Sequence, residues 1–513
     1  MQNGSLIRAN FYHIPRANLE TVTDYLGLRL DGEGALHRQL YRALRHAILA
    51  GHLSEGSRLP ATRALARDLR LSRNTVLLVF EQLTAEGYLA GRTGSGTYVA
   101  SPLPEAMLAP EALRDAPPAA TAEPRWSRFA HCIRRYPPAA PRSTAAPRYD
   151  FRYGAIDAEP RLLDEWRKRL GRAAQHYPVD YADPRGDPGL RAAIARYVSR
   201  SRGCHCTAGQ IVVTSGSQQA LDLIARLLLD AGDRVAIENP GYLGARNAFL
   251  NAGAELMPAG VDTEGLIVDQ LPATARLVYT TPSHQFPTGA VLSLRRRLAL
   301  LEWAQNREAW IVEDDYDGEY RYEGRPVEAV QGLDRPGRTL YVGTFSKVLF
   351  PAARLGYVIL PESMLDTFAA AKWWTDRHTP VLEQRVLADF LDDGEFERHL
   401  RRMRKRYALR RTALIDALRR HFGEKAEITG TQAGLHLMVR LKDYSSGGLK
   451  RLIDAAREKG IGLYSAAPLY LAPHEAPPCL LMGYATLAPE EIQKAIEHLA
   501  SIRISETADA AGG

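Results

Sequence analysis

The sequence predicts a multidomain protein, in which an N-terminal winged helix-turn-helix precedes a larger α/β unit with a mostly parallel sheet. The length of 513 residues exceeds what a single hydrophobic core holds. Residues 34–100 combine helical periods with a glycine-rich hairpin. From residue 149 onward, apolar segments of strand length alternate with helical segments, and this alternation is typical of a parallel sheet covered by helices.

Three helices and a β-hairpin are expected between residues 34 and 100. Apolar side chains at helical spacing predict the first helix over 35–50, and a short second helix follows at 61–69. Ser72 is a natural N-cap for the third helix, which Gly87 ends. Residues 88–100 then give two short strands around a glycine-rich turn.

The third helix begins with polar side chains suited to base edges in the major groove, and the second helix carries arginines suited to phosphates. A further arginine stands just before the turn between the two strands. The candidate DNA-contacting residues are Arg63, Arg67, Arg73, Asn74, Thr75 and Arg92. A helical hairpin that serves dimerisation or links domains is the structural alternative.

Positive charge is concentrated in the first third of the chain. Residues 34–100 hold nine arginines, no lysine and four acidic residues, hence +5, whereas the whole chain carries +7. Residues 101–148 contribute a further +3 and residues 1–33 contribute −1, so residues 149–513 are neutral overall. This asymmetry indicates a polyanionic partner, most simply double-stranded DNA, with a merely solvated basic surface as the alternative.

The stretch 101–148 contains ten prolines and twelve alanines and is interpreted as a semi-extended linker, although WSRFAHCIRRY in its middle is able to dock on a neighbour. Residues 1–33 are an N-terminal extension, 149–504 the larger unit, and 505–513 a disordered tail.

Four cysteines, no secretory signal and no apolar run of membrane-spanning length favour the cytoplasm. Cys204 and Cys206 lack a second pair, so no metal site is assigned.

The string GSRLPATRALARDLRLSRNTVLLVFEQLTAEGYLAGRTGSGTYV resembles the DNA-binding domain of GntR-type bacterial regulators over its whole length. The resemblance implies that Arg63, Arg73, Thr75 and Arg92 contact DNA.

In the larger unit, polar residues that would suit one cofactor follow successive strands. Ser217 and Gln218 begin a helix whose free N–H groups suit a phosphate. Asp314 ends a strand where its carboxylate can pair with a protonated ring nitrogen, and Lys347 ends another strand, with Arg354 seven residues on. Pyridoxal phosphate requires an amine for its aldehyde, a carboxylate for its pyridinium nitrogen and an anion site for its phosphate. Taken singly, each residue is more simply a cap, a loop cation or a surface ion pair.

The motifs VVTSGSQQALDL, NPGY, SHQFPTG, VEDDYDGEY and SKVLFPAARLGY resemble fold type I pyridoxal-phosphate enzymes of the aspartate aminotransferase class across residues 150–500. The resemblance implies these roles: Lys347 as the Schiff-base lysine, Asp314 on the pyridine nitrogen, Tyr316 on the ring hydroxyl, Tyr242 stacked on the ring, and Ser217, Ser346 and Arg354 on the phosphate.

Two positions depart from that class. Phe286 stands before Pro287, where the enzymes carry the asparagine of an Asn-Pro-Thr-Gly turn. Leu481 occupies the apparent place of the arginine that clamps the substrate carboxylate. The second change favours pyridoxal phosphate itself or an amine over an α-amino acid as the effector.

The order of winged helix, linker and aminotransferase-like domain resembles the MocR-type subfamily of GntR transcriptional regulators. This resemblance implies a head-to-tail homodimer that binds operator DNA and pyridoxal phosphate and senses an amine, an amino acid or the cofactor. The competing hypothesis is an active aminotransferase with an accessory DNA-binding domain, and weak transamination is compatible with either. A structural nucleoid-type DNA binder is disfavoured, because it has no use for the cofactor residues.

Overall fold

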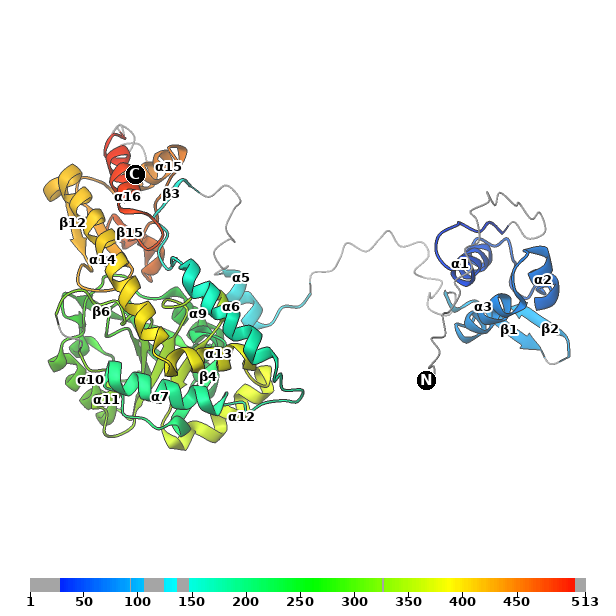
Figure 1. Cartoon of the computed structure of the whole chain (residues 1–513), viewed down its shortest axis with the longest axis horizontal. Helices are drawn as coiled ribbons and strands as arrows, with labels where there is room; N and C mark the ends of the chain where they lie inside the picture. Colours follow the sequence, from blue (N-terminus) through cyan, green and yellow to red (C-terminus); the bar gives the residue numbers. More distant parts are fainter. Residues whose placement is uncertain (1–27, 93, 106–123, 136–146, 325–326, 503–513) are drawn as a thin grey trace, which may run out of the picture. The chain divides into compact units, whose positions relative to one another are not determined.

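The computed structural model describes residues 28–92, 94–105, 124–135, 147–324 and 327–502. The chain divides into two compact units, Met1–Pro124 and Arg125–Gly513 (Figure 1). The tail expected at 505–513 and most of the expected N-terminal extension lie outside the described residues. No helix in the described part is long and apolar enough to cross a membrane.

The small unit has the predicted three helices and hairpin. They are α1 (Leu36–Leu49), α2 (Thr62–Asp68), α3 (Arg73–Ala85), β1 (Leu89–Arg92) and β2 (Gly96–Val99). The two strands pair antiparallel, with Leu89 opposite Val99. The Oγ atom of Ser72 accepts a hydrogen bond of 3.0 Å from the backbone N–H of Thr75, so Ser72 is the N-cap of α3. The predicted winged-helix fold is confirmed.

A separate hydrophobic core holds the small unit together. Leu40 and Leu44 of α1 pack against Val76 and Leu83 of α3, and all four side chains are fully buried. Leu28 joins the same cluster, so the packed unit begins before residue 34, where the sequence placed the start of the domain. The unit therefore has the core it needs to fold as a body of its own.

Replacement of Leu44 by alanine tests this core. Removal of a fully buried leucine side chain is expected to lower the free energy of unfolding of the small unit by about 2–5 kcal/mol. Calorimetry should show a transition of the small unit at lower temperature and an unchanged transition of the large unit. Leu78→Ala is the matched control, because this side chain is 50% exposed. An equal effect of both substitutions would contradict the assignment of the core.

The large unit is built on an eight-stranded sheet in the order β4-β11-β10-β9-β8-β5-β6-β7. The strands β5, β6, β8, β9 and β10 run parallel, whereas β11 is antiparallel to both of its neighbours and β7 is antiparallel to β6. The bounds are β4 Ile211–Thr214, β5 Arg234–Asn239, β6 Glu255–Asp262, β7 Gly265–Leu266, β8 Leu277–Thr280, β9 Trp310–Asp315, β10 Thr339–Thr344 and β11 Gly356–Ile359.

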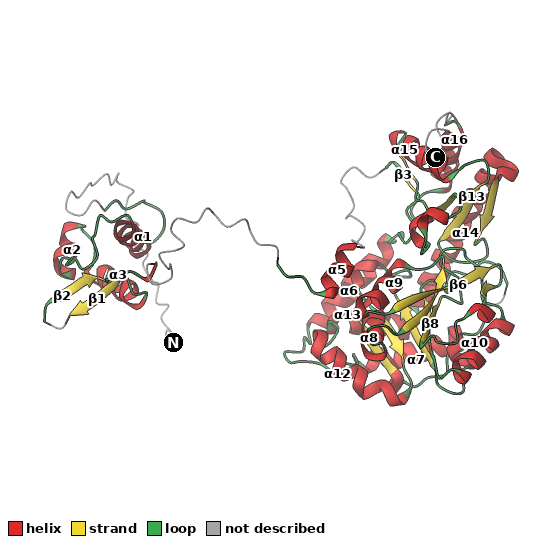
Figure 2. Ribbon diagram, turned by 180° about the vertical axis from the view of Figure 1, so that it is seen from behind, coloured by secondary structure: helices red, strands yellow, loops and turns green. Residues whose placement is uncertain are grey.

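Helices cover both faces of this sheet (Figure 2). They are α6 (Pro160–Ala174), α7 (Pro188–Arg202), α8 (Ser217–Leu228), α9 (Leu243–Ala252), α10 (Leu294–Asn306), α11 (Val330–Leu333), α12 (Leu365–Asp376) and α13 (Val381–Asp392). Along β10, Leu340 and Val342 belong to one hydrophobic cluster and Tyr341 to another. Alternate side chains of the strand thus enter two cores, and the polar residues are left for the strand ends.

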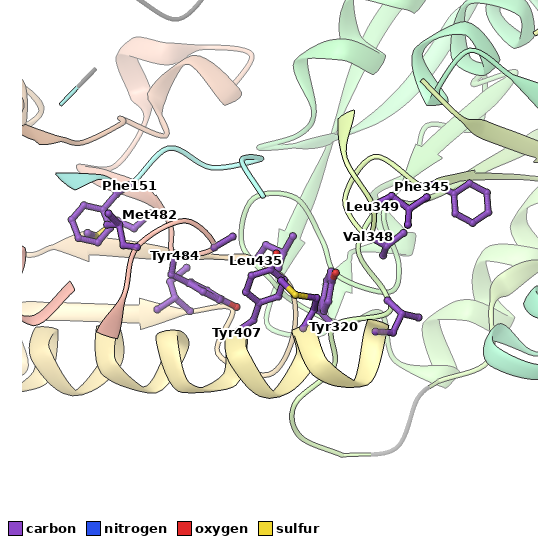
Figure 3. Close-up of a cluster of buried hydrophobic side chains, with 14 of the residues drawn as sticks. Phe151, Tyr320, Phe345, Val348, Leu349, Tyr407, Leu435, Met482 and Tyr484 are labelled. Atoms are coloured by element: carbon purple, nitrogen blue, oxygen red, sulfur yellow. The ribbon is translucent and has the colours of Figure 1, made fainter. Parts of the chain in front are cut away.

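The helix α14 (Glu395–Phe422) connects this sheet to a smaller C-terminal layer. That layer contains the antiparallel strands β12 (Ala426–Thr429), β13 (His436–Leu441) and β15 (Cys479–Gly483), the pair β3 (Tyr149–Asp150) and β14 (Ile461–Gly462), and the helices α15 (Ser446–Glu458) and α16 (Pro489–Ala500). Tyr407 of α14 packs edge-on against Tyr320, with ring centroids 5.1 Å apart (Figure 3). One continuous core therefore joins the two layers.

A helix interrupts the stretch 101–148 that was interpreted as a linker. Residues Arg128–Arg135 form α5, which packs against α9. The Arg128 guanidinium donates to the carbonyl oxygen of Gly253 at 3.3 Å, and the Cys132 thiol lies 3.8 Å from the carbonyl oxygen of Leu250. The interpretation as a semi-extended linker does not hold for these residues. They make up most of the segment WSRFAHCIRRY, for which docking on a neighbour was expected to be possible.

Candidate functional site

A cavity of about 730 Å³ opens at the carboxyl ends of the parallel strands. Such strand ends gather ligand groups in α/β folds. All eight residues proposed from the sequence for a cofactor line this cavity. They are Ser217, Gln218, Tyr242, Asp314, Tyr316, Ser346, Lys347 and Arg354.

Asp314 is the acid of this cavity, at the end of β9. Its Oδ2 atom accepts a 2.7 Å hydrogen bond from the Tyr279 hydroxyl, while the buried Oδ1 atom has no partner among the described residues. Burial raises the pKa of Asp314 to about 7, against the opposing effect of the Tyr279 hydrogen bond. An unpaired buried carboxylate oxygen is costly unless a donor meets it, and a protonated ring nitrogen is such a donor.

Lys347 follows β10 and is the amine of the cavity. Its Nζ atom donates a 2.9 Å hydrogen bond to the carbonyl oxygen of Gly154. Gly154 follows the end of the short strand β3 by four residues. Burial lowers the pKa of Lys347, against the influence of Asp317 and Asp314. A lowered pKa increases the neutral fraction of the amine, which is the form that attacks an aldehyde.

The end of the cavity near α8 is shaped for an anion. Gly216, with φ of 82°, precedes the first turn of α8, whose free N–H groups point outward. The Arg354 guanidinium donates to the Ser215 carbonyl oxygen at 2.7 Å and lies beside Gly216. A Cβ atom at Gly356 would lie 2.7 Å from the Gly216 carbonyl carbon, so glycine at this position lets β11 approach the turn.

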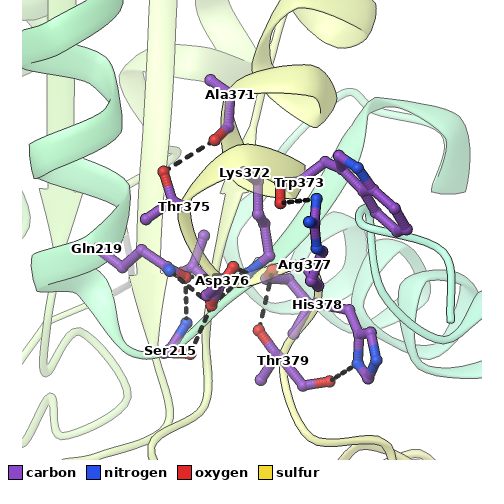
Figure 4. A network of polar contacts seen from close by, with 12 residues as sticks. Ser215, Gln219, Ala371, Lys372, Trp373, Thr375, Asp376, Arg377, His378 and Thr379 are labelled. Atoms are coloured by element: carbon purple, nitrogen blue, oxygen red, sulfur yellow. Dashed lines mark hydrogen bonds and ion pairs between the residues drawn. The ribbon is translucent and has the colours of Figure 1, made fainter. Parts of the chain in front are cut away.

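The buried side chain of Lys372 stabilises this turn through a network of polar contacts (Figure 4). The Lys372 amine lies 2.9 Å from Asp376 and 3.0 Å from the Gln219 amide oxygen. The same Gln219 oxygen accepts from the backbone N–H of Ser215 at 2.8 Å. Burial lowers the pKa of Lys372, while Asp376 opposes that shift. The network thus ties the turn before α8 to α12.

Tyr316 lines the cavity, and a second polar pair holds its hydroxyl. The hydroxyl lies 2.9 Å from Nδ1 of His284, and that nitrogen lies 3.1 Å from Asp317. Sequence reasoning singled out Tyr316 but missed His284 and Asp317. The available signal was the position of His284 in SHQFPTG, two residues before Phe286.

His284, Asp317 and His436 form a buried group whose ligand-type atoms lie within 4.8 Å of one another. Burial, and then the proximity of His284, lower the pKa of His436 to about 3, so its ring is neutral. Its Nε2 atom lies 3.2 Å from the Pro287 carbonyl oxygen. His284 and Asp317 are thus hydrogen-bonded to each other, and the His436 ring packs against the His284 ring with centroids 5.0 Å apart.

Apolar groups stand at both positions that depart from the aminotransferase class. Phe286 lines the cavity, and its ring meets Tyr242 edge-on with centroids 6.0 Å apart. Leu481 is fully buried in the same apolar cluster as Phe286. Arg152, which sequence reasoning did not single out, lies in the cavity wall, with its guanidinium 5.9 Å from the centre of the Tyr464 ring.

Gln218 and Ser346 also have local polar contacts. The Gln218 amide donates to the Gly244 carbonyl oxygen at 3.0 Å, which ties the start of α8 to α9. The backbone N–H of Ser346 donates to the Thr344 hydroxyl at 3.2 Å, and this contact shapes the turn before Lys347.

In the small unit, α2 and the first turn of α3 carry exposed polar groups. Arg63 and Arg67 are exposed on α2, and Arg73 and Asn74 begin α3 exposed. Thr75 is half-buried, because its hydroxyl lies 2.8 Å from the Ser72 hydroxyl. The hydroxyl of Thr75 therefore serves the N-cap as well as any contact with DNA.

The wing carries two arginines. The Arg92 guanidinium lies 4.7 Å from the centre of the Tyr98 ring, which holds this long side chain at the hairpin. Arg58, which was not singled out from the sequence, lies beside the same hairpin, where a Cβ atom at Gly96 would be 3.1 Å from its Nε atom. An arginine before the second helix was recognisable in GSRLP, but its place at the wing depends on the fold.

Comparison with known proteins assigns both units. Residues 36–99 match the gntR family of bacterial regulatory proteins, and residues 151–499 match aminotransferases of class I and II. The large unit is similar to the crystal structure of a Pyrococcus horikoshii kynurenine aminotransferase, with a TM-score of 0.64 and 29% identity. The match covers 77% of this chain and 98% of that one.

Full-length relatives carry the same combination. The "Probable rhizopine catabolism regulatory protein MocR" of Rhizobium meliloti is 40% identical over 93% of this chain and 95% of its own length. The "HTH-type transcriptional regulator TauR" of Rhodobacter capsulatus is 38% identical over 75% of this chain and 80% of its own. The fold and the site thus define a GntR-type helix-turn-helix unit joined to a fold type I aminotransferase unit. The chain belongs to the MocR-type subfamily of GntR regulators.

The raised pKa of Asp314 predicts a specific pH dependence of stability. The folded protein keeps this proton up to about pH 7, whereas the unfolded chain loses it near its ordinary value of 3.8. Folding therefore takes up a proton in this interval, and this contribution to stability is lost as pH rises through 7. Asp314→Asn cannot ionise. In protein freed of small molecules, thermal unfolding from pH 4 to 7 should show wild type losing stability relative to Asp314→Asn, and parallel curves would contradict the assignment.

Proposed function

We propose that this protein is a DNA-binding transcriptional regulator whose large unit binds pyridoxal phosphate and senses the cofactor itself or an amine. The main support for this proposal is that one cavity combines three features. They are the unpaired Oδ1 atom of Asp314, the buried Lys347 amine and the turn at Gly216, which is suited to an anion. These three features match the three polar parts of the cofactor. The related kynurenine aminotransferase was solved with PMP, a form of the same cofactor.

Each lining residue then has a role. Lys347 supplies the amine for the cofactor aldehyde, and Asp314 holds the protonated ring nitrogen. Tyr316, fixed by His284, faces the ring hydroxyl, and Tyr242 packs against the ring. Ser217, Ser346 and Arg354 bind the phosphate. When bound, the cofactor supplies an electrophilic carbon that exchanges one amine for another.

The effector side of the cavity favours an amine. Leu481 is buried in an apolar cluster, so it offers no bidentate partner for an α-carboxylate. Phe286 makes the adjoining wall apolar as well. We infer that the effector is the cofactor itself or an amine, with an amino acid as the weaker alternative.

A route from the cavity toward the DNA-binding unit begins at Gly154. The hydrogen bond from the Lys347 amine ends on the Gly154 carbonyl oxygen. Gly154 lies four residues beyond β3 and follows the stretch 101–148, whose helix α5 already packs on the large unit. If the Lys347 amine were engaged by the cofactor, it would no longer hold the Gly154 carbonyl oxygen, and the segment after β3 would lose this contact.

We propose a cytoplasmic, head-to-tail homodimer that presents two winged helices to paired half-sites in operator DNA. Each would contact DNA through Arg63, Arg67, Arg73, Asn74, Thr75 and Arg92. An exposed group of apolar side chains on the large unit supports association. Val179 is fully exposed, Trp374 is 78% exposed, and Tyr177 and Tyr181 are about two-thirds exposed.

The second candidate function, an aminotransferase with an accessory DNA-binding domain, rests on the presence of Lys347 and Asp314 in one cavity. Turnover on the order of 1–1000 per second, with DNA affinity indifferent to ligand, would favour it. Buried Leu481 at the place of the carboxylate clamp argues against it.

Lys347→Ala separates the sensor from a simple DNA binder. Wild type incubated with pyridoxal phosphate and then reduced with borohydride should keep the cofactor covalently, as mass spectrometry would show, and Lys347→Ala should not. On duplexes selected from a random library by the full chain, pyridoxal phosphate should change the affinity of wild type and leave that of Lys347→Ala unchanged. Lys450→Ala, an exposed lysine on α15, is the control. Wild type that gains no bound cofactor would refute the proposal.

Arg73→Ala tests the reading helix. Because Arg73 is exposed at the start of α3, its loss should weaken binding to the selected duplex by about 1–3 kcal/mol and relax sequence preference. Cofactor binding by the large unit should stay as in wild type. Sequence preference that survives in Arg73→Ala, measured by competition with scrambled duplex, would contradict the assignment.

A further inference from the structure

A second basic surface lies on the large unit, away from the cofactor cavity. Nine residues surround a hollow of about 620 Å³, and seven of them are cationic while none is acidic. We name this hollow the α14 basic surface. Its cations are Arg161, Arg321, Arg398, Arg401, Arg402, Arg404 and Lys405.

A neighbouring hollow of about 400 Å³ extends the same surface. The two hollows share Arg321, Arg401 and Arg404, and the second adds Arg200 and Arg202. The second hollow also contains Glu319 and Glu397. The positive charge is therefore spread along a continuous depression instead of converging on one point.

Several of these charges have no acidic counterpart. Neither Arg401 nor Lys405 makes a hydrogen bond or ion pair with any described residue, and both are exposed. Arg404 donates to the backbone carbonyl oxygen of Glu319 at 2.7 Å, a contact that leaves its charge uncompensated. By contrast, Arg398 and Arg402 share Glu395, at 2.7 and 3.1 Å.

Three positive charges, of which Arg401 and Lys405 have no acidic partner among the described residues, stand in a row on one helix. Arg398, Arg401 and Lys405 recur at intervals of three and four residues, which places them on one face of α14. Like charges at this spacing cost up to about 0.5 kcal/mol per pair in an isolated helix. A polyanion that binds along the row removes this repulsion.

We propose that the α14 basic surface binds the phosphate backbone of double-stranded DNA, as a second contact that is independent of the winged helix and of the cofactor. The row from Arg398 to Lys405 spans about 10 Å along the helix axis. One strand of B-form DNA carries a phosphate about every 3.4 Å of axial rise, and successive phosphates lie farther apart than this because the strand winds around the axis, so the row can meet about two phosphates. A GntR-type unit on the same chain raises the local concentration of duplex near this surface.

The spread of charge favours duplex DNA over a small phosphorylated molecule. A compact anion is best held by donors that converge on it, whereas contacts to a duplex are distributed along the backbone and read no base. The surface offers arginines and a lysine on one helical face and no group aimed at base edges. The contact is therefore expected to be independent of sequence and strongly dependent on salt.

The test uses the full chain and a labelled duplex of arbitrary sequence, several helical turns long. Binding is measured by fluorescence anisotropy over a range of NaCl concentrations. The substitutions Arg63→Glu and Arg73→Glu, made together, first disable the winged helix. In this background, weak binding should persist, and addition of Arg401→Glu and Lys405→Glu should lower the affinity at least about tenfold. The slope of log affinity against log salt should become shallower by about 2.

Arg419→Glu with Arg420→Glu is the matched control. Both arginines are exposed on the same helix and outside the two hollows, and the change in charge is the same. Arg401→Gln with Lys405→Gln provides a milder pair, and an unchanged thermal transition confirms folding. Equal affinities and salt slopes for the test and control pairs would overturn the proposal. If the test pair abolished binding of inorganic triphosphate and left DNA binding intact, the surface would be assigned to small anions. This result would also overturn the proposal.

Discussion

Burial of the eight-stranded sheet on both faces is the constraint on which the rest of the large unit depends. Because alternate side chains of β10 enter two different cores, the polar groups of the cavity gather toward the carboxyl ends of the strands. Asp314 ends β9 and Lys347 follows β10, which is the parallel neighbour of β9. The register of these two strands therefore brings the acid and the amine into one cavity. The low-dielectric surroundings that raise the pKa of Asp314 also lower that of Lys347.

The winged helix and the main cofactor residues could be predicted because each depends on signals local in the sequence. Ser72 marks the start of α3, because its side chain caps the helix. Lys347 and Arg354 both lie in the single connection between two strands, seven residues apart. Contacts between distant segments could not be predicted. The hydrogen bond from Lys347 to Gly154 spans 193 residues, and the one from Tyr316 to His284 spans 32. No local pattern records such pairings.

The two departures from the aminotransferase class acquire a common meaning in the structure. Phe286 and Leu481 were separate anomalies in the sequence, yet both side chains belong to one buried apolar cluster. The cavity retains its acid, its amine and its anion end, while Leu481 offers no bidentate partner for an α-carboxylate. Such a change weakens orientation of an amino-acid substrate more than it weakens retention of a cofactor.

Coupling between cavity and DNA requires only that ligand binding change the free energy of a segment that both units share. In the proposed regulator, Gly154 is a candidate for such a point, because its carbonyl oxygen is held by the Lys347 amine and it lies four residues beyond β3. A hydrogen bond of this kind contributes about 0.5–1.5 kcal/mol in a typical case, and the Lys347 amine would give it up if the cofactor of the proposed function engaged it. If all of that free energy reached the winged helix, DNA affinity would change by at most roughly two- to twelve-fold. By linkage, DNA would then change the affinity for the ligand by the same factor.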